Sequence, residues 1–224
     1  MCAVVARSAL GRSISIGGGI VRKFSARISI AVTAALILAA ATSSASANHL
    51  MFTHNNIRIT WNPVRFVGGT ITVTCNLTLE GSFHSATIAK VVETLIGHIT
   101  RGAIEGCSGG TVTLLMETLP WHLRYNGFTG ALPNIRLLIV HGIGFSYRIQ
   151  PTGSVPCLLK TTATEPAGFE QVVGASGEIN NTRWDSREIA LDGLLCAWAG
   201  TAHLEGNGRT TVLNSGTTIT VTLI

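Results

Sequence analysis

The stretch from Thr70 to Glu80 alternates apolar and polar residues without a break. Every second side chain is apolar, in the order Ile71, Val73, Cys75, Leu77 and Leu79. A period of two places these side chains on one face of a β-strand, so the pattern predicts a strand with one buried face. Cys75 stands in the middle of that face. A disulfide partner for it must therefore come from a neighbouring strand or loop across the core.

The same alternation recurs along the chain, between segments rich in Gly, Asn and Asp. It is clear in residues 143–150 and 217–223, and turn sequences such as Gly68-Gly69 and Asp192-Gly193 separate the segments. About ten short strands joined by short turns indicate a single mainly β domain. We expect an antiparallel β-sandwich, with barrel-like closure of the sheet as the alternative. A membrane barrel is disfavoured, because the aromatic residues are too scattered to form girdles.

One segment departs from the two-residue period. Between Ser85 and Arg101 the apolar residues fall at helical spacing, at Ile88, Val91, Val92, Leu95, Ile96 and Ile99. Ser85 could cap such a helix, whereas the β-branched residues and Gly97 lower its propensity. The spacing predicts one short helix near residues 85–101.

Residues 1–47 have the three parts of a secretory signal peptide. The apolar run 28–41 follows Arg22, Lys23 and Arg27 and precedes the small-residue site Ala45-Ser46-Ala47. The run is shorter than the roughly 20 residues that a membrane-spanning helix needs. We therefore expect a secreted, extracellular domain of residues 48–224 with no stable membrane span after cleavage. Translation from Val21 would give a leader of ordinary length.

The positive charge of the chain belongs to this leader. Five of the 16 basic residues lie before residue 48, which leaves 11 basic and 11 acidic residues in the expected mature chain. The remaining Lys and Arg form no run, so we expect no nucleic-acid partner.

Four cysteines remain after the leader, namely Cys75, Cys107, Cys157 and Cys196. An even number of cysteines in an exported chain favours two disulfides. Four cysteines allow three pairings, and sequence-local pairing of Cys75 with Cys107 and of Cys157 with Cys196 is preferred because sequential strands are usually neighbours. A zinc site formed by these cysteines is the alternative interpretation. The chain has no C-x-x-C or H-x-H spacing, so we expect no metal site and no cofactor.

Residues Gly106 to Gly110 match the box around the nucleophile of chymotrypsin-type proteases. That mechanism needs a histidine base oriented by a carboxylate, in the chain order His, Asp, Ser, and no Asp precedes Asp185. A glycine-rich turn that delivers Cys107 to a disulfide explains the match with fewer assumptions.

The segment from Pro120 to Phe128 is the most chemically mixed part of the chain. In a strand, Trp121 and Tyr125 would share one face while His122 and Arg124 would share the other. These four residues are the candidate binding site, because stacking rings beside polar groups can form a ligand groove. The simpler interpretation is that the aromatic residues are core and the polar residues form a solvated face.

Three segments, residues 79–84, 119–122 and 127–134, resemble a group of uncharacterised secreted all-β proteins of high-GC Gram-positive bacteria. The likeness covers most of the expected mature chain. It implies secretion, and it brings no known activity or site residues.

Three classes of function follow. A secreted binding or interaction module is preferred, its partner being an extracellular ligand such as a glycan or the cell-wall surface. A hydrolase acting on an extracellular glycan or other polymer is the second class, and it would need two carboxylates, which are dispersed in the sequence, to meet in the fold. A structural component of the cell envelope is the third.

Overall fold

The computed structural model describes residues 49–131, 134–187, 189–190 and 202–224, all within the unit Ser46–Ile224. The described residues form strands, with one 3₁₀ turn (η2, Met116–Thr118) and no α-helix. The strands are β1 (His49–Phe52), β2 (Asn56–Gly68), β3 (Ile71–Phe83), β4 (Thr87–Ala89), β5 (Leu95–Ser108), β6 (Gly110–Leu114), β7 (Trp121–Ala131), β8 (Asn134–Ile143), β9 (Ser146–Pro151), β10 (Cys157–Lys160), β11 (Ala167–Val173), β12 (Ile179–Arg187), β13 (Ile189–Ala190), β14 (Ala202–Val212) and β15 (Val221–Leu223).

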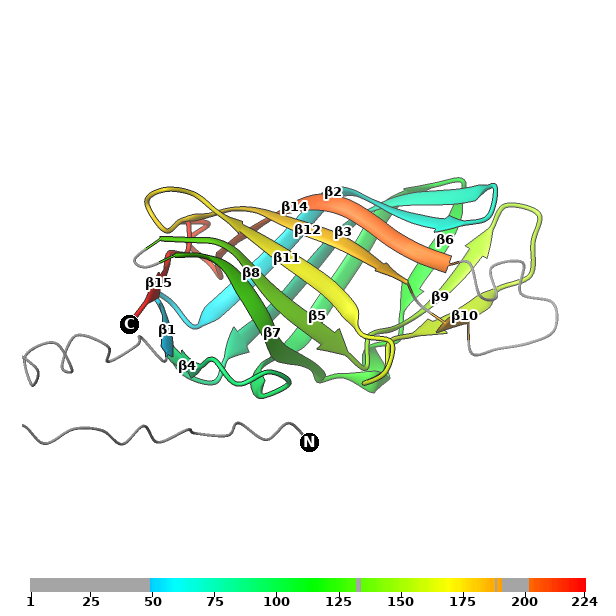
Figure 1. Ribbon diagram of the computed structural model, residues 1–224. Coiled ribbons are helices and arrows are strands. Elements are labelled where there is room, and N and C mark those ends of the chain that lie inside the picture. Colours follow the sequence, from blue (N-terminus) through cyan, green and yellow to red (C-terminus); the bar gives the residue numbers. More distant parts are fainter. Residues whose placement is uncertain (1–48, 132–133, 188, 191–201) are drawn as a thin grey trace, which may run out of the picture. The chain divides into compact units, whose positions relative to one another are not determined.

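Eight of these strands form a closed antiparallel barrel in the order β11-β12-β14-β2-β3-β5-β7-β8 (Figure 1). The eight strands follow one another around the barrel in chain order from β2 to β14, and the pairing of β14 with β2, from Ala202 opposite Gly68 to Val212 opposite Ile57, closes it. The predicted mainly β, antiparallel fold is confirmed. The main sheet closes on itself, so the alternative of barrel-like closure replaces two sheets packed face to face.

The predicted strand 70–80 belongs to β3 from Ile71 onward, and its apolar face points into the barrel. Val73, Cys75, Leu77 and Leu79 are each at most 1% exposed. The interior also holds a connected group of rings from different strands and one loop: Trp61, Trp121, Phe145, Phe169 and Trp184. Ring centroids within this group lie 4.6 to 6.0 Å apart in tilted or edge-on pairs, as aromatic quadrupoles prefer.

Two small sheets lie at opposite ends of the barrel (Figure 1). One has the order β15-β1-β4 and buries Leu50 and Phe52 of β1. The other has the order β13-β10-β9-β6 and buries Tyr147 and Ile149 of β9. Each sheet adds apolar side chains to the same hydrophobic core.

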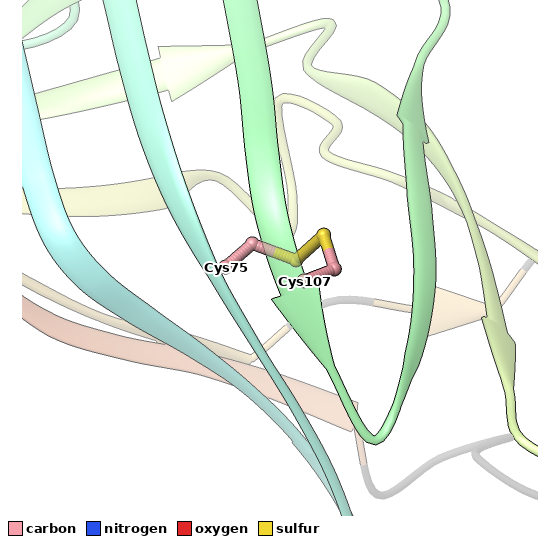
Figure 2. The surroundings of a disulfide bond; sticks show 2 residues. All are labelled: Cys75 and Cys107. Carbon is pink, nitrogen blue, oxygen red and sulfur yellow. A yellow bond between two sulfur atoms is a disulfide. The ribbon is translucent and has the colours of Figure 1, made fainter.

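The predicted Cys75–Cys107 disulfide is present and joins β3 to β5, with an S–S distance of 2.08 Å (Figure 2). The register between these strands shifts here, so that Gly106 and Cys107 together oppose Cys75. Gly106 has a φ of +62°, which suits glycine at such a bulge. Residues 106–110, which match the protease motif, thus end β5 and form the turn into β6.

The second predicted disulfide has one member outside the described residues. Cys157 begins β10 and is buried, whereas Cys196 lies in the segment 191–201 that the structure does not describe. The Cys157–Cys196 pairing stays a prediction. The expected leader, residues 1–47, also lies outside the described residues.

The predicted helix near residues 85–101 is wrong. This segment contains the short strand β4, a turn, and the beginning of β5. The register between β5 and β7 shifts between Leu95 and Gly97, so the buried residues Ile96 and Ile99 are three positions apart. The bulge therefore reproduces the spacing of a helix inside a strand.

Candidate functional site

A groove of about 510 Å³ opens on the outside of the barrel. It is lined by Asn62, Pro63, Arg65, Arg183, Trp184, Glu205, Gly206 and Asn207. These residues come from β2, β12 and β14, which are neighbours in the barrel although they are far apart in the sequence.

Irregular pairing accompanies the groove. The register between β2 and β3 shifts between Trp61 and Val64, which brackets the lining residues Asn62 and Pro63. The register between β14 and β2 shifts between Gly206 and Gly208. Proline has no N–H to donate to a ladder, and bulges are where it is tolerated in a strand. Bulges also bend a strand and redirect its side chains. The groove thus lies where two neighbouring strands of the barrel depart from regular pairing.

Four of the lining residues make polar side-chain contacts, one within the groove and two with residues beside it. Arg65 pairs with Glu205 on the adjacent strand, and Arg183 Nη1 lies 3.2 Å from Glu170 Oε2. Asn181 Nδ2 donates a hydrogen bond of 3.0 Å to Asn207 Oδ1. These contacts orient long side chains that would otherwise sample many rotamers.

The groove can both donate and accept hydrogen bonds. Each guanidinium carries five N–H donors, and an ion pair to one nitrogen leaves others for a ligand. Asn62 and Asn207 offer amide donors and acceptors, while Glu205 accepts only. Glu205 is the one carboxylate among the described lining residues. The groove is thus equipped for a polar ligand bearing hydroxyl or acidic groups.

The four sequence-predicted binding residues lie on both faces of β7. Trp121 and Tyr125 point into the barrel and are 1% and 3% exposed, and burial raises the pKa of Tyr125. His122 and Arg124 lie on the outer face and are partly exposed. The predicted division of the segment into two faces is confirmed, and the aromatic residues belong to the core. Of these four residues, a ligand on the surface of β7 can reach only His122 and Arg124.

His122 belongs to a row of three imidazoles across neighbouring strands. His98 on β5 lies directly opposite His122, with ring centroids 5.1 Å apart. On its other side, His98 Nδ1 lies 2.8 Å from Nε2 of His84, which follows β3. Burial, followed by the neighbouring His84 and His122, lowers the pKa of His98. His98 therefore stays neutral to a lower pH than an isolated histidine.

Arg124 belongs to a second polar cluster on the same outer face. Its Nη1 lies 3.7 Å from Glu93 Oε2, and the other oxygen of Glu93 lies 2.8 Å from His141 Nδ1. Glu93 has a φ of +64°, an uncommon backbone conformation for a residue other than glycine. Its N–H donates to the carbonyl of Tyr125 at 2.7 Å, which holds this turn against β7. The cluster fixes the orientation of the His141 ring.

Sequence reasoning missed the groove and the histidine row. In both, the contributing residues are distant in the chain, so no local spacing could indicate them. Among the described residues, no group of three or more His, Cys, Asp or Glu side chains is arranged to hold a metal ion. No helix in the described ranges is long and apolar enough to cross a membrane.

Comparison of the chain with protein-family models, curated proteins and solved structures found no match. The fold and the surface therefore define the class of protein. It is an eight-stranded antiparallel barrel with a disulfide between two of its strands and a polar groove on its outer face.

Proposed function

We propose that this protein is an exported binding module whose ligand is a hydroxyl-rich polymer, such as a cell-wall glycan, held in the groove over β2, β12 and β14. The observation that carries the proposal is the groove itself. Its volume of about 510 Å³ is in the usual range of ligand sites, which is about 300 to 1,000 Å³, and its walls carry two arginines, two asparagines and a glutamate.

Three further observations support this proposal. Sugar hydroxyls both donate and accept hydrogen bonds, so they match a groove that offers both kinds of group. The groove residues lie on long, mutually paired strands, and a rigid scaffold lowers the entropy cost of binding. The disulfide and the leader-like residues 1–47 support export, because disulfides persist in oxidising compartments.

The test is retention of the full chain on insoluble peptidoglycan and on a panel of immobilised glycans. We expect the wild-type chain to bind one member of the panel. The double variant Arg65→Ala with Arg183→Ala should weaken binding at least about tenfold, because each arginine supplies charge-assisted hydrogen bonds that contribute about 1.5–3 kcal/mol. Exposed ion pairs contribute little to folding, so the variant should unfold like the wild type.

Two matched variants make the test specific. Arg148→Ala removes an exposed arginine of β9, outside the groove, and should bind like the wild type. His122→Ala with Arg124→Ala removes the polar pair that the sequence predicted. If this second variant loses binding while the groove variant keeps it, or if the wild-type chain is retained by nothing on the panel, the proposal is wrong.

A further inference from the structure

The row of three histidines, His84, His98 and His122, lies outside the groove and carries imidazole nitrogens that can bind metal ions. His98 lies on β5, and His84, 14 positions earlier, directly follows the neighbouring strand β3. Their ring nitrogens Nδ1 and Nε2 face one another at 2.8 Å. One nitrogen must carry the proton and the other must present its lone pair, so at least one ring of the pair is neutral. Neutral imidazole is the form that binds metal ions.

We propose that His84 and His98 form a two-imidazole site for one divalent transition-metal ion, with Zn²⁺ as the representative case. The ion replaces the proton shared between the rings. When the donor ring is neutral, its proton moves to the nitrogen that faces away, so both facing nitrogens become ligands and no proton is released; when the donor ring is an imidazolium, its facing proton leaves to solvent. Water completes the coordination.

The distances in the pair are close to those that such an ion requires. Zn–N bonds of about 2.0–2.1 Å place two imidazole nitrogens on one ion about 3.0 to 3.4 Å apart. The nitrogens of His84 and His98 therefore need to separate by only a few tenths of an ångström, together with a rotation of the rings. The His84 side chain is exposed and His98 is partly exposed, so hydrated ions can reach the pair from solvent.

The backbone holds the two residues in this relation. His98 is paired in the ladder with Ser82 on one side and with His122 on the other. The N–H of His84 donates to the carbonyl of Ile96 at 2.9 Å, which fixes the chain just after β3. Two ligands preset on a rigid sheet lose less entropy on binding than two free side chains. Imidazole nitrogens are suitable ligands for Zn, Cu and Ni, whereas Mg and Ca prefer oxygen.

The experiment is a calorimetric titration of Zn²⁺ into the full chain, prepared without a polyhistidine tag at neutral pH. We expect one saturable site per chain. Removing an outer-shell partner of a metal ligand costs about 10- to 100-fold in affinity, so loss of a ligand in His84→Ala or His98→Ala should weaken binding at least tenfold. The matched control is His203→Ala, which removes a partly exposed histidine from β14, away from the row.

Two readouts separate loss of a ligand from loss of the fold. His84→Gln and His98→Gln keep a polar side chain and should lose binding with an unchanged circular dichroism spectrum. In the wild-type chain, Zn²⁺ should shift the ¹⁵N resonances of His84 Nε2 and His98 Nδ1. The proposal is overturned if no saturable site exists, if His203→Ala costs as much as His84→Ala, or if the shifts occur at other histidines.

Discussion

Trp121 lies in the interior of the barrel. Its ring packs 4.6 Å from that of Phe145, and its Nε1–H donates a hydrogen bond of 2.7 Å to Thr118 Oγ1. Trp121→Ala should therefore lower the free energy of unfolding by about 3–5 kcal/mol, the usual cost of deleting a buried tryptophan. Urea unfolding measures this change. Val91→Ala, at a position that is 59% exposed, should change it by less than about 0.5 kcal/mol. Equal unfolding midpoints for the two variants would contradict the burial of Trp121.

The alternation around Trp121 predicted which side chains share a face, and the structure confirms that division. The sequence could not predict which face meets a ligand, because exposure depends on the curvature of the closed sheet. His122 and Arg124 are on the outside, yet each has polar neighbours from other strands or turns, such as His98 and Glu93. Those neighbours lie more than 20 positions away in the chain, beyond the reach of any local pattern.

At the level of elements, the Cys75–Cys107 disulfide between β3 and β5 is the feature that the sequence predicted best. It closes a loop with a sequence separation of 32 and should stabilise the fold by about 3 to 4 kcal/mol through the entropy of the unfolded chain. Cys75→Ala with Cys107→Ala should lower the unfolding free energy by that amount in thermal or urea unfolding. Cys107→Ala alone should cost nearly as much, since either change removes the bond. A double variant as stable as the wild type would show that the disulfide contributes nothing to the free energy of unfolding.

The strand β5 shows why the predicted helix was wrong. Helical spacing in residues 88–99 comes from three separate sources: one buried residue in β4, exposed valines in a turn, and the bulge in β5. A turn bond from the N–H of Thr94 to the carbonyl of Val91 ends any regular pattern there. A register shift is a tertiary feature, so a period count over one segment cannot separate it from a helix.

At the scale of the whole molecule, closure of the barrel creates the candidate site. The groove joins residues near positions 62–65, 183–184 and 205–207, which meet because β2, β12 and β14 are consecutive strands of the closed sheet. The sequence predicted a mainly β fold and allowed closure, but it did not predict the strand order. Without that order the groove could not be anticipated.

The most direct measurement is amide NMR of the full chain titrated with soluble peptidoglycan fragments. If the groove is the binding site, the largest chemical-shift changes will fall at Arg65, Arg183 and Asn207, on the three strands that line it. Changes concentrated at His122 and Arg124 instead, or no changes at any residue up to saturating fragment, would contradict the account.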